Sequence, residues 1–400
     1  MNLETPRKFR AFVEQSYQVA ANFFRPISRK YDLAEHTYPV ELDMLASLME
    51  GMNEAGGTEV GAGQLRRESG GESGVRNGSN MATVLGLTEL CWGDVGLALT
   101  IPRQGLGNSA ISAVATDDQR KRFAGKWASM AITEPEAGSD SAAIRTTARQ
   151  DGDHWVLNGQ KIYVTAGERC DAVVVWATLD PKLGRAAIKS FVVEKGTPGM
   201  TVVGLEKKLG IRASDTATIA FEECRIPRDN ILGSPEIDTE KSFAGVMQTF
   251  DNTRPVVAAM AIGVARASLD LTRELLAKEG VEARYESAAF NQSAAGAELL
   301  RMEAELEAAR RLTLRAAWMA DNGKPNSMEA SMARAKAGRV ANAITLRCVE
   351  LCGSAGYAER ELLEKWARDS KILDIFEGTQ QIQLLVVSRR LLGKSSSELR

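Results

Sequence analysis

The sequence contains only two histidines, His36 and His154, in 400 residues. A histidine-based metal site needs more ligands than this, and a Ser-His-Asp triad would have to use one of the two. His154 stands beside Trp155 in a predicted strand, where a surface cross-strand position is the simpler interpretation. We assign neither histidine a catalytic role, and we expect no metal site.

Cysteine is also scarce. The five cysteines are odd in number, widely spread and without a CxxC pair, namely Cys91, Cys170, Cys224, Cys348 and Cys352. This spacing predicts reduced core thiols in a cytosol-like compartment. Acidic residues interrupt the N-terminal segment, so neither a signal peptide nor a transmembrane helix is predicted there. A cytoplasmic location is therefore expected, without membrane insertion.

Charge of either sign is not in excess, because 50 Lys and Arg stand against 52 Asp and Glu, a formal net charge of −2. No general electrostatic attraction to nucleic acid or to an anionic membrane follows. Hydrophobic residues make up 44% of the chain, enough for a large core, and 400 residues exceed what one compact core organises. Several domains are predicted.

The pattern along the chain predicts an α+β multidomain protein. Residues 1–125 form a helical domain, with amphipathic segments at Phe9 to Phe24 and Val40 to Met52 and a polar loop from Gly56 to Asn80. A helix over Met81 to Leu99 should end or bend before Pro102. Residues 126–240 form an antiparallel β domain, where Asn158-Gly159 predicts a two-residue hairpin turn.

Residues 241–400 return to the helical period and predict a four-helix-bundle type of domain. Its apolar stripes recur at three- and four-residue spacing, for example at Ala258, Ile262, Ala265 and Leu269. Turns at Asn322-Gly323 and at Gly353 to Gly356 should separate its long helices.

The segment DIFEGTQQIQ, residues 374–383, places one carboxylate in an apolar and amide-rich setting. Gly378 can take a positive φ, and Thr379 can cap the helix that follows. Glu377, between apolar neighbours, could then be desolvated enough to act as a proton acceptor. These ten residues alone also suit an exposed acid in an ordinary helix-capping turn.

Two segments of the β domain suit a flat or anionic ligand. ITEPEAGSD, residues 132–140, offers small residues and backbone N–H groups. KIYVTAG places Tyr163 and Thr165 on one face of a strand, where an aromatic ring and a hydroxyl could pack beside a ring cofactor. A half-buried strand with no ligand is the local alternative.

Together these segments resemble the acyl-CoA dehydrogenase family over nearly the whole chain. AITEPEAGSD is similar to the first signature of the family, and KLGIRASDT with FEECRIPRDNILG to the exit from its β domain. FDNTRPVVAA resembles the start of the third domain in the medium-chain branch, and IFEGTQQIQ the loop with the catalytic base. The four matches occur in the order of the family.

The resemblance implies FAD as cofactor and an acyl-CoA thioester as substrate, with Glu377 taking the α-proton and flavin N5 the β-hydride. Thr253 occupies the alternative base position of the family, which leaves the role to Glu377. The implied cofactor-binding residues are Ile132, Thr133, Ser139, Tyr163, Thr165, Arg284, Glu350, Gly353, Thr379 and Gln381. The implied substrate-binding residues are Ser139, Asp251, Arg254 and Gly378.

The resemblance further implies a homotetramer that passes electrons to electron-transfer flavoprotein. The segments around Arg284 and Glu350 depart from the cofactor motifs that cross the dimer interface of the family. Either Arg284 still reaches the pyrophosphate, or FAD binds weakly and a non-identical partner subunit completes the site. An acyl-CoA oxidase, a flavin monooxygenase-type member and a partner subunit are the alternative functions.

Overall fold

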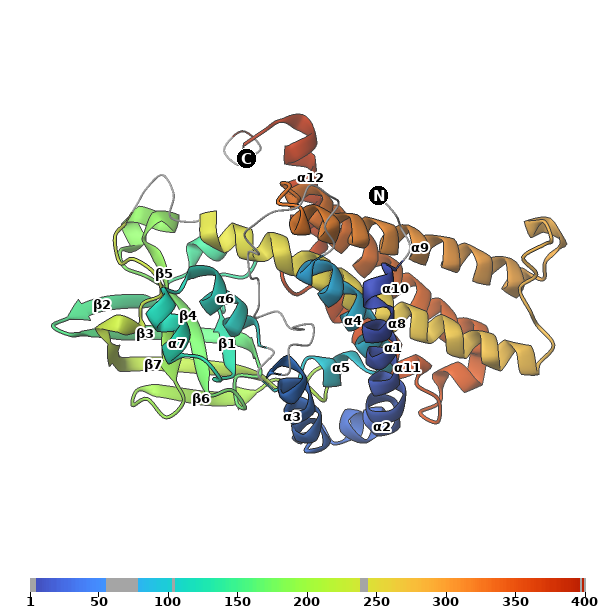
Figure 1. The fold of residues 1–400 in the computed structure, drawn as a ribbon, viewed down its shortest axis with the longest axis horizontal. Coiled ribbons are helices and arrows are strands. Elements are labelled where there is room, and N and C mark those ends of the chain that lie inside the picture. The colour runs from blue at the N-terminus through green and yellow to red at the C-terminus, as the bar shows by residue number, and fades with distance from the viewer. Residues whose placement is uncertain (1–4, 55–77, 103–104, 238–243, 396–397, 399–400) are drawn as a thin grey trace.

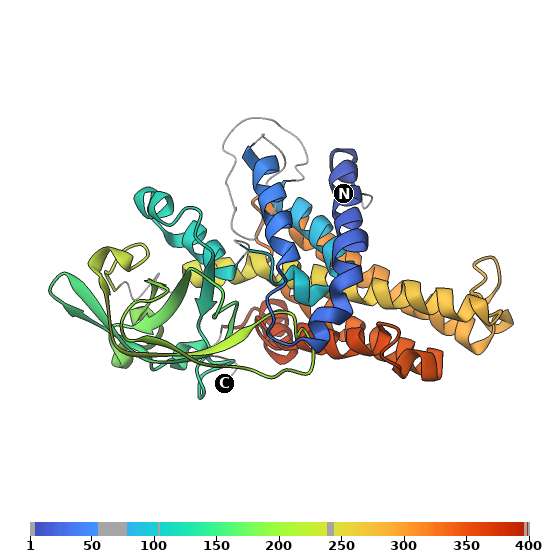
Figure 2. The same ribbon diagram turned by 90° about the horizontal axis from the view of Figure 1, so that it is seen from below.

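The computed structural model describes residues 5–54, 78–102, 105–237, 244–395 and 398. A β domain occupies one end of the molecule and a bundle of long helices the other, with the N-terminal helices packed against both (Figure 1). Seen from below, the helical hairpin of residues 244–278 and 294–321 extends away from the sheet (Figure 2). The predicted order of helical domain, β domain and helical bundle is confirmed.

Short helices build the N-terminal domain. They are η1 (Arg7–Phe9), α1 (Arg10–Val19), the π-turn η2 (Ala20–Phe24), α2 (Arg25–Leu33), α3 (Glu41–Glu54), α4 (Ser79–Gly93), α5 (Val95–Ala98), α6 (Leu106–Val114) and α7 (Asp117–Arg122). The helix predicted over residues 81–99 is broken at Asp94, whose extended backbone ends α4 and whose carboxylate caps α5 through Leu97 N. Most of the predicted loop at 56–80 lies outside the described residues.

The β domain is a curled sheet in the order β1-β4-β2-β3-β7-β6, with β5 paired to β4. Its strands are β1 (Ala128–Ala131), β2 (Thr147–Asp151), β3 (His154–Thr165), β4 (Ala172–Thr178), β5 (Ile188–Glu194), β6 (Met200–Leu205) and β7 (Thr216–Pro227). The 3₁₀ turns η3 (Ser141–Ala143) and η4 (Pro181–Ala187) lie between strands, and η5 (Arg228–Asn230) follows β7. Most pairs are antiparallel, but β4 runs parallel to β1 and β2.

The hairpin turn predicted at Asn158-Gly159 is wrong. These residues lie inside the continuous strand β3, at a shift in its register against β7, and the turn to β2 falls instead at residues 152–153. Gly159 is needed there because a Cβ atom would stand 2.4 Å from Thr146 Oγ1. An Asn-Gly pair therefore marks a bulge in this sheet.

The C-terminal domain contains α8 (Ala244–Lys278), η6 (Ala289–Asn291), α9 (Ala294–Asp321), α10 (Ser327–Tyr357), α11 (Leu363–Ser370), η7 (Lys371–Asp374) and α12 (Gln380–Leu392). The segment Thr253–Lys278 of α8 is long and apolar enough to cross a membrane, yet 78% of its most apolar window is buried inside this protein. Its composition is explained by its place at the centre of the bundle. The turn predicted at Gly353 to Gly356 is a kink at Gly353 within α10, which continues to Tyr357.

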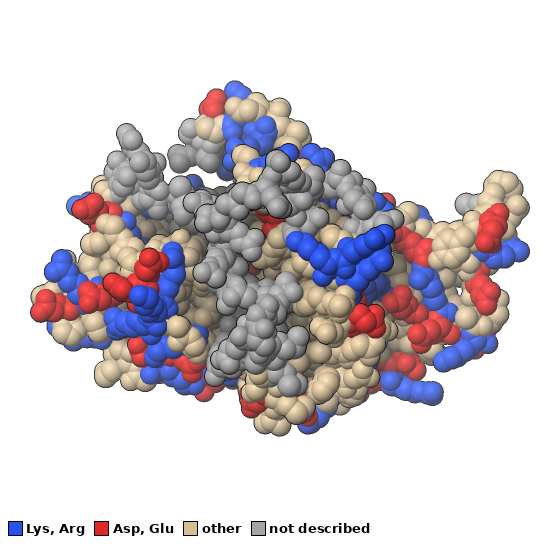
Figure 3. Space-filling view, in the orientation of Figure 1, with Lys and Arg blue, Asp and Glu red and all other residues tan. Residues whose placement is uncertain are grey.

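All five cysteines are free, four of them fully buried, as predicted. On the described part of the face seen in Figure 3, acidic and basic side chains are interspersed over the β domain and the bundle. That face therefore presents no extended field of one sign.

Candidate active site

Glu377 lies in the short connection between η7 and α12. Its backbone has φ 55° and Gly378 has φ 90°, so two consecutive residues adopt left-handed conformations. A residue with a side chain is disfavoured there by roughly 1–2 kcal/mol, and such strain persists where the surroundings impose it. Thr379 caps α12 by accepting the N–H of Ile382, as predicted.

Gln383 imposes this turn from the first turn of α12. Its buried side-chain amide donates to Glu377 O at 3.2 Å and to Gly378 O at 3.1 Å. The hydrogen bonds satisfy two carbonyls that the left-handed turn removes from regular helix pairing. The turn, its glycine and its capping residue were predicted from the sequence, but Gln383 was not.

The carboxylate of Glu377 points into the protein. Although part of the residue reaches solvent, Oε2 is buried and has no hydrogen-bond partner among the described residues. Burial raises the pKa of Glu377 above its ordinary value of 4.5, while the Thr253 hydroxyl and the charges of Arg334 and Arg254 oppose the rise in part. A carboxylate with a raised pKa is the better proton acceptor at neutral pH.

Helix α8 supplies two of the groups that face this carboxylate. Thr253 and Arg254 are both buried, with 5% and 4% of their surface exposed. The structure therefore places Thr253, which the resemblance put at the alternative base position, within hydrogen-bonding reach of Glu377. The side chain of Asp251, also predicted to bind substrate, lies outside what the structure describes.

The β domain brings four predicted cofactor residues together. Ile162 N donates to Thr133 O at 2.9 Å, which ties the segment after β1 to β3 beside Tyr163. Ser129 Oγ donates to Thr165 O at 2.8 Å from the same side. Tyr163 itself is 62% exposed and also has a positive φ, at a second shift of register in β3.

Other predicted cofactor residues lie elsewhere. Arg284 donates to Asn291 O at 2.6 Å within the connection from α8 to α9, at the end of the bundle away from the sheet (Figure 1). At the same end, Glu350 pairs with Arg347 at 2.6 Å, and Arg347 also contacts Glu298 near the start of α9. One chain therefore does not bring Arg284, Glu350 or Gly353 to Glu377. Ser139 and Gln381 are exposed on their own segments.

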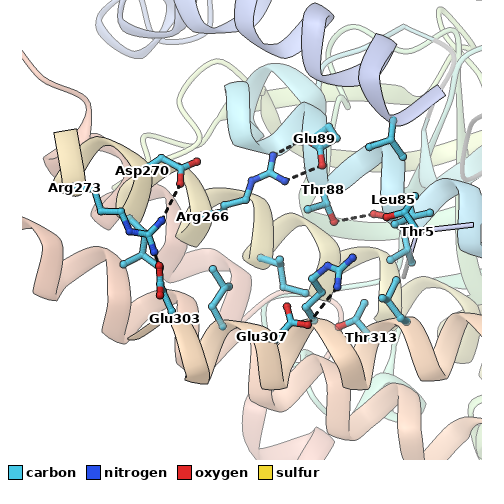
Figure 4. Close-up of a pocket in the computed structure, with 17 residues that line it drawn as sticks. Thr5, Leu85, Thr88, Glu89, Arg266, Asp270, Arg273, Glu303, Glu307 and Thr313 are labelled. Carbon is cyan, nitrogen blue, oxygen red and sulfur yellow. Dashed lines mark hydrogen bonds and ion pairs between the residues drawn. The ribbon is translucent and has the colours of Figure 1, made fainter. Parts of the chain in front are cut away.

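A separate cavity of about 490 Å³ lies between α1, α4, α8 and α9 (Figure 4). Its lining combines apolar side chains with ion pairs such as Arg266–Glu89 and Arg310–Glu307. None of the predicted site residues belongs to it. Each charged side chain among its described lining residues takes part in an ion pair with another of them.

Comparison with known proteins identifies the class. Residues 6–131, 129–224 and 243–392 match the profiles of the acyl-CoA dehydrogenase N-terminal, middle and C-terminal domains. The chain is 40% identical over 298 residues to the mitochondrial short-chain specific acyl-CoA dehydrogenase of Bos taurus, covering 70% of this chain and 68% of that protein. With the protein of the same name from Mus musculus it shares 40% identity over 272 residues, or 66% and 62% of the two chains.

The fold extends the likeness to the whole chain. Butyryl-CoA dehydrogenase from Megasphaera elsdenii superposes with a TM-score of 0.82 at 28% identity, covering 98% of this chain and 100% of that one. The matches define a flavoprotein oxidoreductase of fatty acid metabolism. The chain belongs to the acyl-CoA dehydrogenase family, which confirms the resemblance seen in its motifs.

Proposed function

We propose that this protein uses FAD to convert an acyl-CoA thioester into the trans-2-enoyl-CoA, with Glu377 as the base that removes the α-proton. The observation that carries the proposal is the buried Oε2 of Glu377, which has no hydrogen-bond partner among the described residues and lies in a strained turn. In an ordinary helix-capping turn the glutamate side chain would lie in solvent, and its pKa would stay close to the ordinary value.

The same turn offers a donor for the developing enolate oxygen. Within the described residues, no hydrogen bond takes up the N–H of Glu377. A fixed backbone N–H beside the base would stabilise the oxyanion of the thioester as the proton leaves. Base and donor then belong to one residue, so the left-handed turn orients both.

The open face of β3 fits a flavin ring. Tyr163 exposes most of its aromatic surface beside Thr165 and the segment of Ile132 and Thr133, although a large apolar ring is normally covered. When bound there, FAD would supply the hydride acceptor that no side chain provides. Thr379 and Gln381 would hold its adenosine half.

A second copy of the chain would complete this site. The connection from α8 to α9, which carries Arg284, lies at the end of the bundle away from the sheet (Figure 1). The contact of Arg347 with Glu298 brings Glu350 and Gly353 of α10 to that end as well, so in a dimer these residues can serve the cofactor of the neighbour. The ion pair between Glu350 and Arg347 neutralises the acid that would otherwise repel a pyrophosphate. We propose a homotetramer with electron-transfer flavoprotein as acceptor.

The decisive test is to mix the purified yellow protein with butyryl-CoA and with longer and branched acyl-CoAs in the absence of oxygen. Bleaching of the flavin is expected, and it should be fastest with short chains if the named substrates of the two relatives carry over. Absence of bleaching with every thioester would favour a non-catalytic partner subunit. Oxygen consumption after bleaching would favour an oxidase or a monooxygenase.

A buried ion pair supports the flavin-binding segment. Lys161, which is 0% exposed, donates to Ile132 O at 2.9 Å and to Glu134 Oε1 at 2.7 Å. Glu134 also accepts from Arg145 N and from the N–H and hydroxyl of Thr146. Burial lowers the pKa of Lys161 to about 8, and Glu134 limits the fall, so the lysine remains charged at neutral pH.

Lys161→Met is expected to weaken FAD binding roughly 10- to 100-fold, the effect of losing one or two charge-assisted hydrogen bonds in the segment proposed to hold the flavin. Titration of flavin-free protein with FAD measures the loss, and circular dichroism checks the fold. Lys195→Met, which removes an exposed lysine of the same domain, is the control. Equal FAD affinity in both variants would show that the pair does not support the cofactor.

A further inference from the structure

Arg334 is a fully buried arginine on α10, with 0% of its surface exposed. Its Nη2 donates to Phe376 O at 2.8 Å, the carbonyl immediately before Glu377. Nε and Nη1 are buried without a hydrogen-bond partner among the described residues. Burying a guanidinium with most of its donors unused is costly, so a compensating role is expected for it.

The helix is built to admit this side chain beneath the turn. Gly338 lies one turn further along α10, where a Cβ atom would stand 2.8 Å from Arg334 Nη1 and 2.6 Å from Leu373 O. Any other residue at 338 would push apart the guanidinium, the helix and η7. The glycine therefore allows the arginine and the segment leading to Glu377 to pack directly on α10.

Several charged and polar groups surround the carboxylate of Glu377. Thr253 and Arg254 face it from α8, and Arg334 faces it from α10. Asp374, at the end of η7, acts on Arg334 in turn. Burial lowers the pKa of Arg334 to about 10, partly offset by Glu377 and Asp374, so Arg334 keeps its charge at neutral pH.

We infer that Arg334 is a positioning residue for the proposed base: its hydrogen bond to Phe376 O fixes the left-handed turn, and its fixed charge favours ionised Glu377. The inference rests on the proposed function, because it concerns the residue that would take the proton. Arg334 holds the backbone on one side of the turn as Gln383 does on the other. The two side chains together explain how a non-glycine residue keeps a positive φ there.

The test is the pH dependence of kcat/KM for Arg334→Met and Arg334→Lys in FAD-loaded protein. Activity that needs ionised Glu377 rises as pH rises through the pKa of that carboxyl, and this rise is the acid limb of the pH profile. Arg334→Met removes a neighbouring positive charge, so this acid limb should move to higher pH by about one to three units. Arg334→Lys should leave the limb near its wild-type position but lower kcat, because an ammonium does not reproduce the planar hydrogen-bonding group.

Arg25→Met is the matched control. Arg25 is a partly buried arginine that donates to Trp92 O at 2.6 Å, and its acidic neighbours are Asp94, Asp270 and Glu274 rather than Glu377. Its loss should change stability without moving the acid limb. An unmoved limb in folded, FAD-loaded Arg334→Met would overturn the inference.

Two further measurements keep the test decisive. If Arg334→Met does not fold, Arg334→Lys decides alone, and wild-type kcat in that variant would reject the positioning role. Glu377→Gln is assayed in parallel. Loss of turnover in Glu377→Gln together with an unmoved limb in Arg334→Met would refute the role of Arg334 alone, whereas an active Glu377→Gln would refute the base itself.

Discussion

Glu377→Gln is expected to lower turnover by about three orders of magnitude or more, the scale on which a positioned base contributes. Glutamine keeps the size and the backbone contacts of the residue, so the turn, the Gln383 hydrogen bonds and the bound flavin should survive. Stopped-flow measurement of flavin reduction under anaerobic conditions isolates the chemical step. The residual activity should also lose the acid limb of its pH profile, because that limb reports the ionisation of Glu377.

Glu329→Gln provides the control for this change. Glu329 is likewise a buried carboxylate of the bundle, 8% exposed, but it pairs with Arg315 at 3.3 Å. Its replacement should leave flavin reduction close to the wild-type rate. Near-wild-type reduction in Glu377→Gln would mean that another group takes the α-proton.

The parts of this site that are local in sequence could be predicted from it. A glycine followed by a capping threonine before an amide-rich helix specifies the turn around Glu377, since each element acts within a few residues. The same holds for the three-domain order, because periodicity is a local property. The hairpin turn predicted at Asn158-Gly159 was wrong because this dipeptide suits both a hairpin turn and a bulge. Contacts with Thr146 and β7, which are remote in sequence, decide between the two.

Arg334, which supports the turn from α10, was not predicted because its partner is remote in the chain. Arg334 contacts a carbonyl 42 residues away, and nothing near it in sequence identifies that partner. The sequence did contain one signal. Arg334 is a charged residue within a stripe of buried alanines, Ala330, Ala333, Ala337 and Ala341. A lone charge on such a face must find a polar partner inside the protein.

A second buried cluster joins the three domains around Lys365. Its Nζ lies 2.7 Å from Asp94 Oδ2 and 2.6 Å from Asp369 Oδ2. Asp94 belongs to the N-terminal domain, Lys365 and Asp369 to α11, and Asp369 also accepts the N–H of Ile211 from the β domain at 2.5 Å. Burial would lower the pKa of Lys365, but the two carboxylates outweigh it and raise the pKa above 10.5.

Lys365→Met is therefore expected to cost about 3–5 kcal/mol of unfolding free energy, since it leaves two buried carboxylates without their cation. A domain is typically stable by only about 5–15 kcal/mol, so the loss should be visible as a lowered urea midpoint. Lys30→Met removes a more exposed lysine from an ion pair with Glu41 and should shift the midpoint little. Equal shifts of the urea midpoint in the two variants would contradict a stabilising role for the buried cluster around Lys365.

The destabilisation by Lys365→Met is expected to depend on pH. Burial and the charge of Asp94 raise the pKa of Asp369 above 3.8, and Lys365 opposes that rise. Without the lysine this rise would be larger, so the folded state would bind a proton at Asp369 still more tightly than the unfolded state does. Stability then falls as pH rises through the folded pKa, so the difference between Lys365→Met and the wild type should be larger at pH about 8 than at pH about 5.5. A difference independent of pH would indicate that lost packing, rather than lost charge, destabilises the variant.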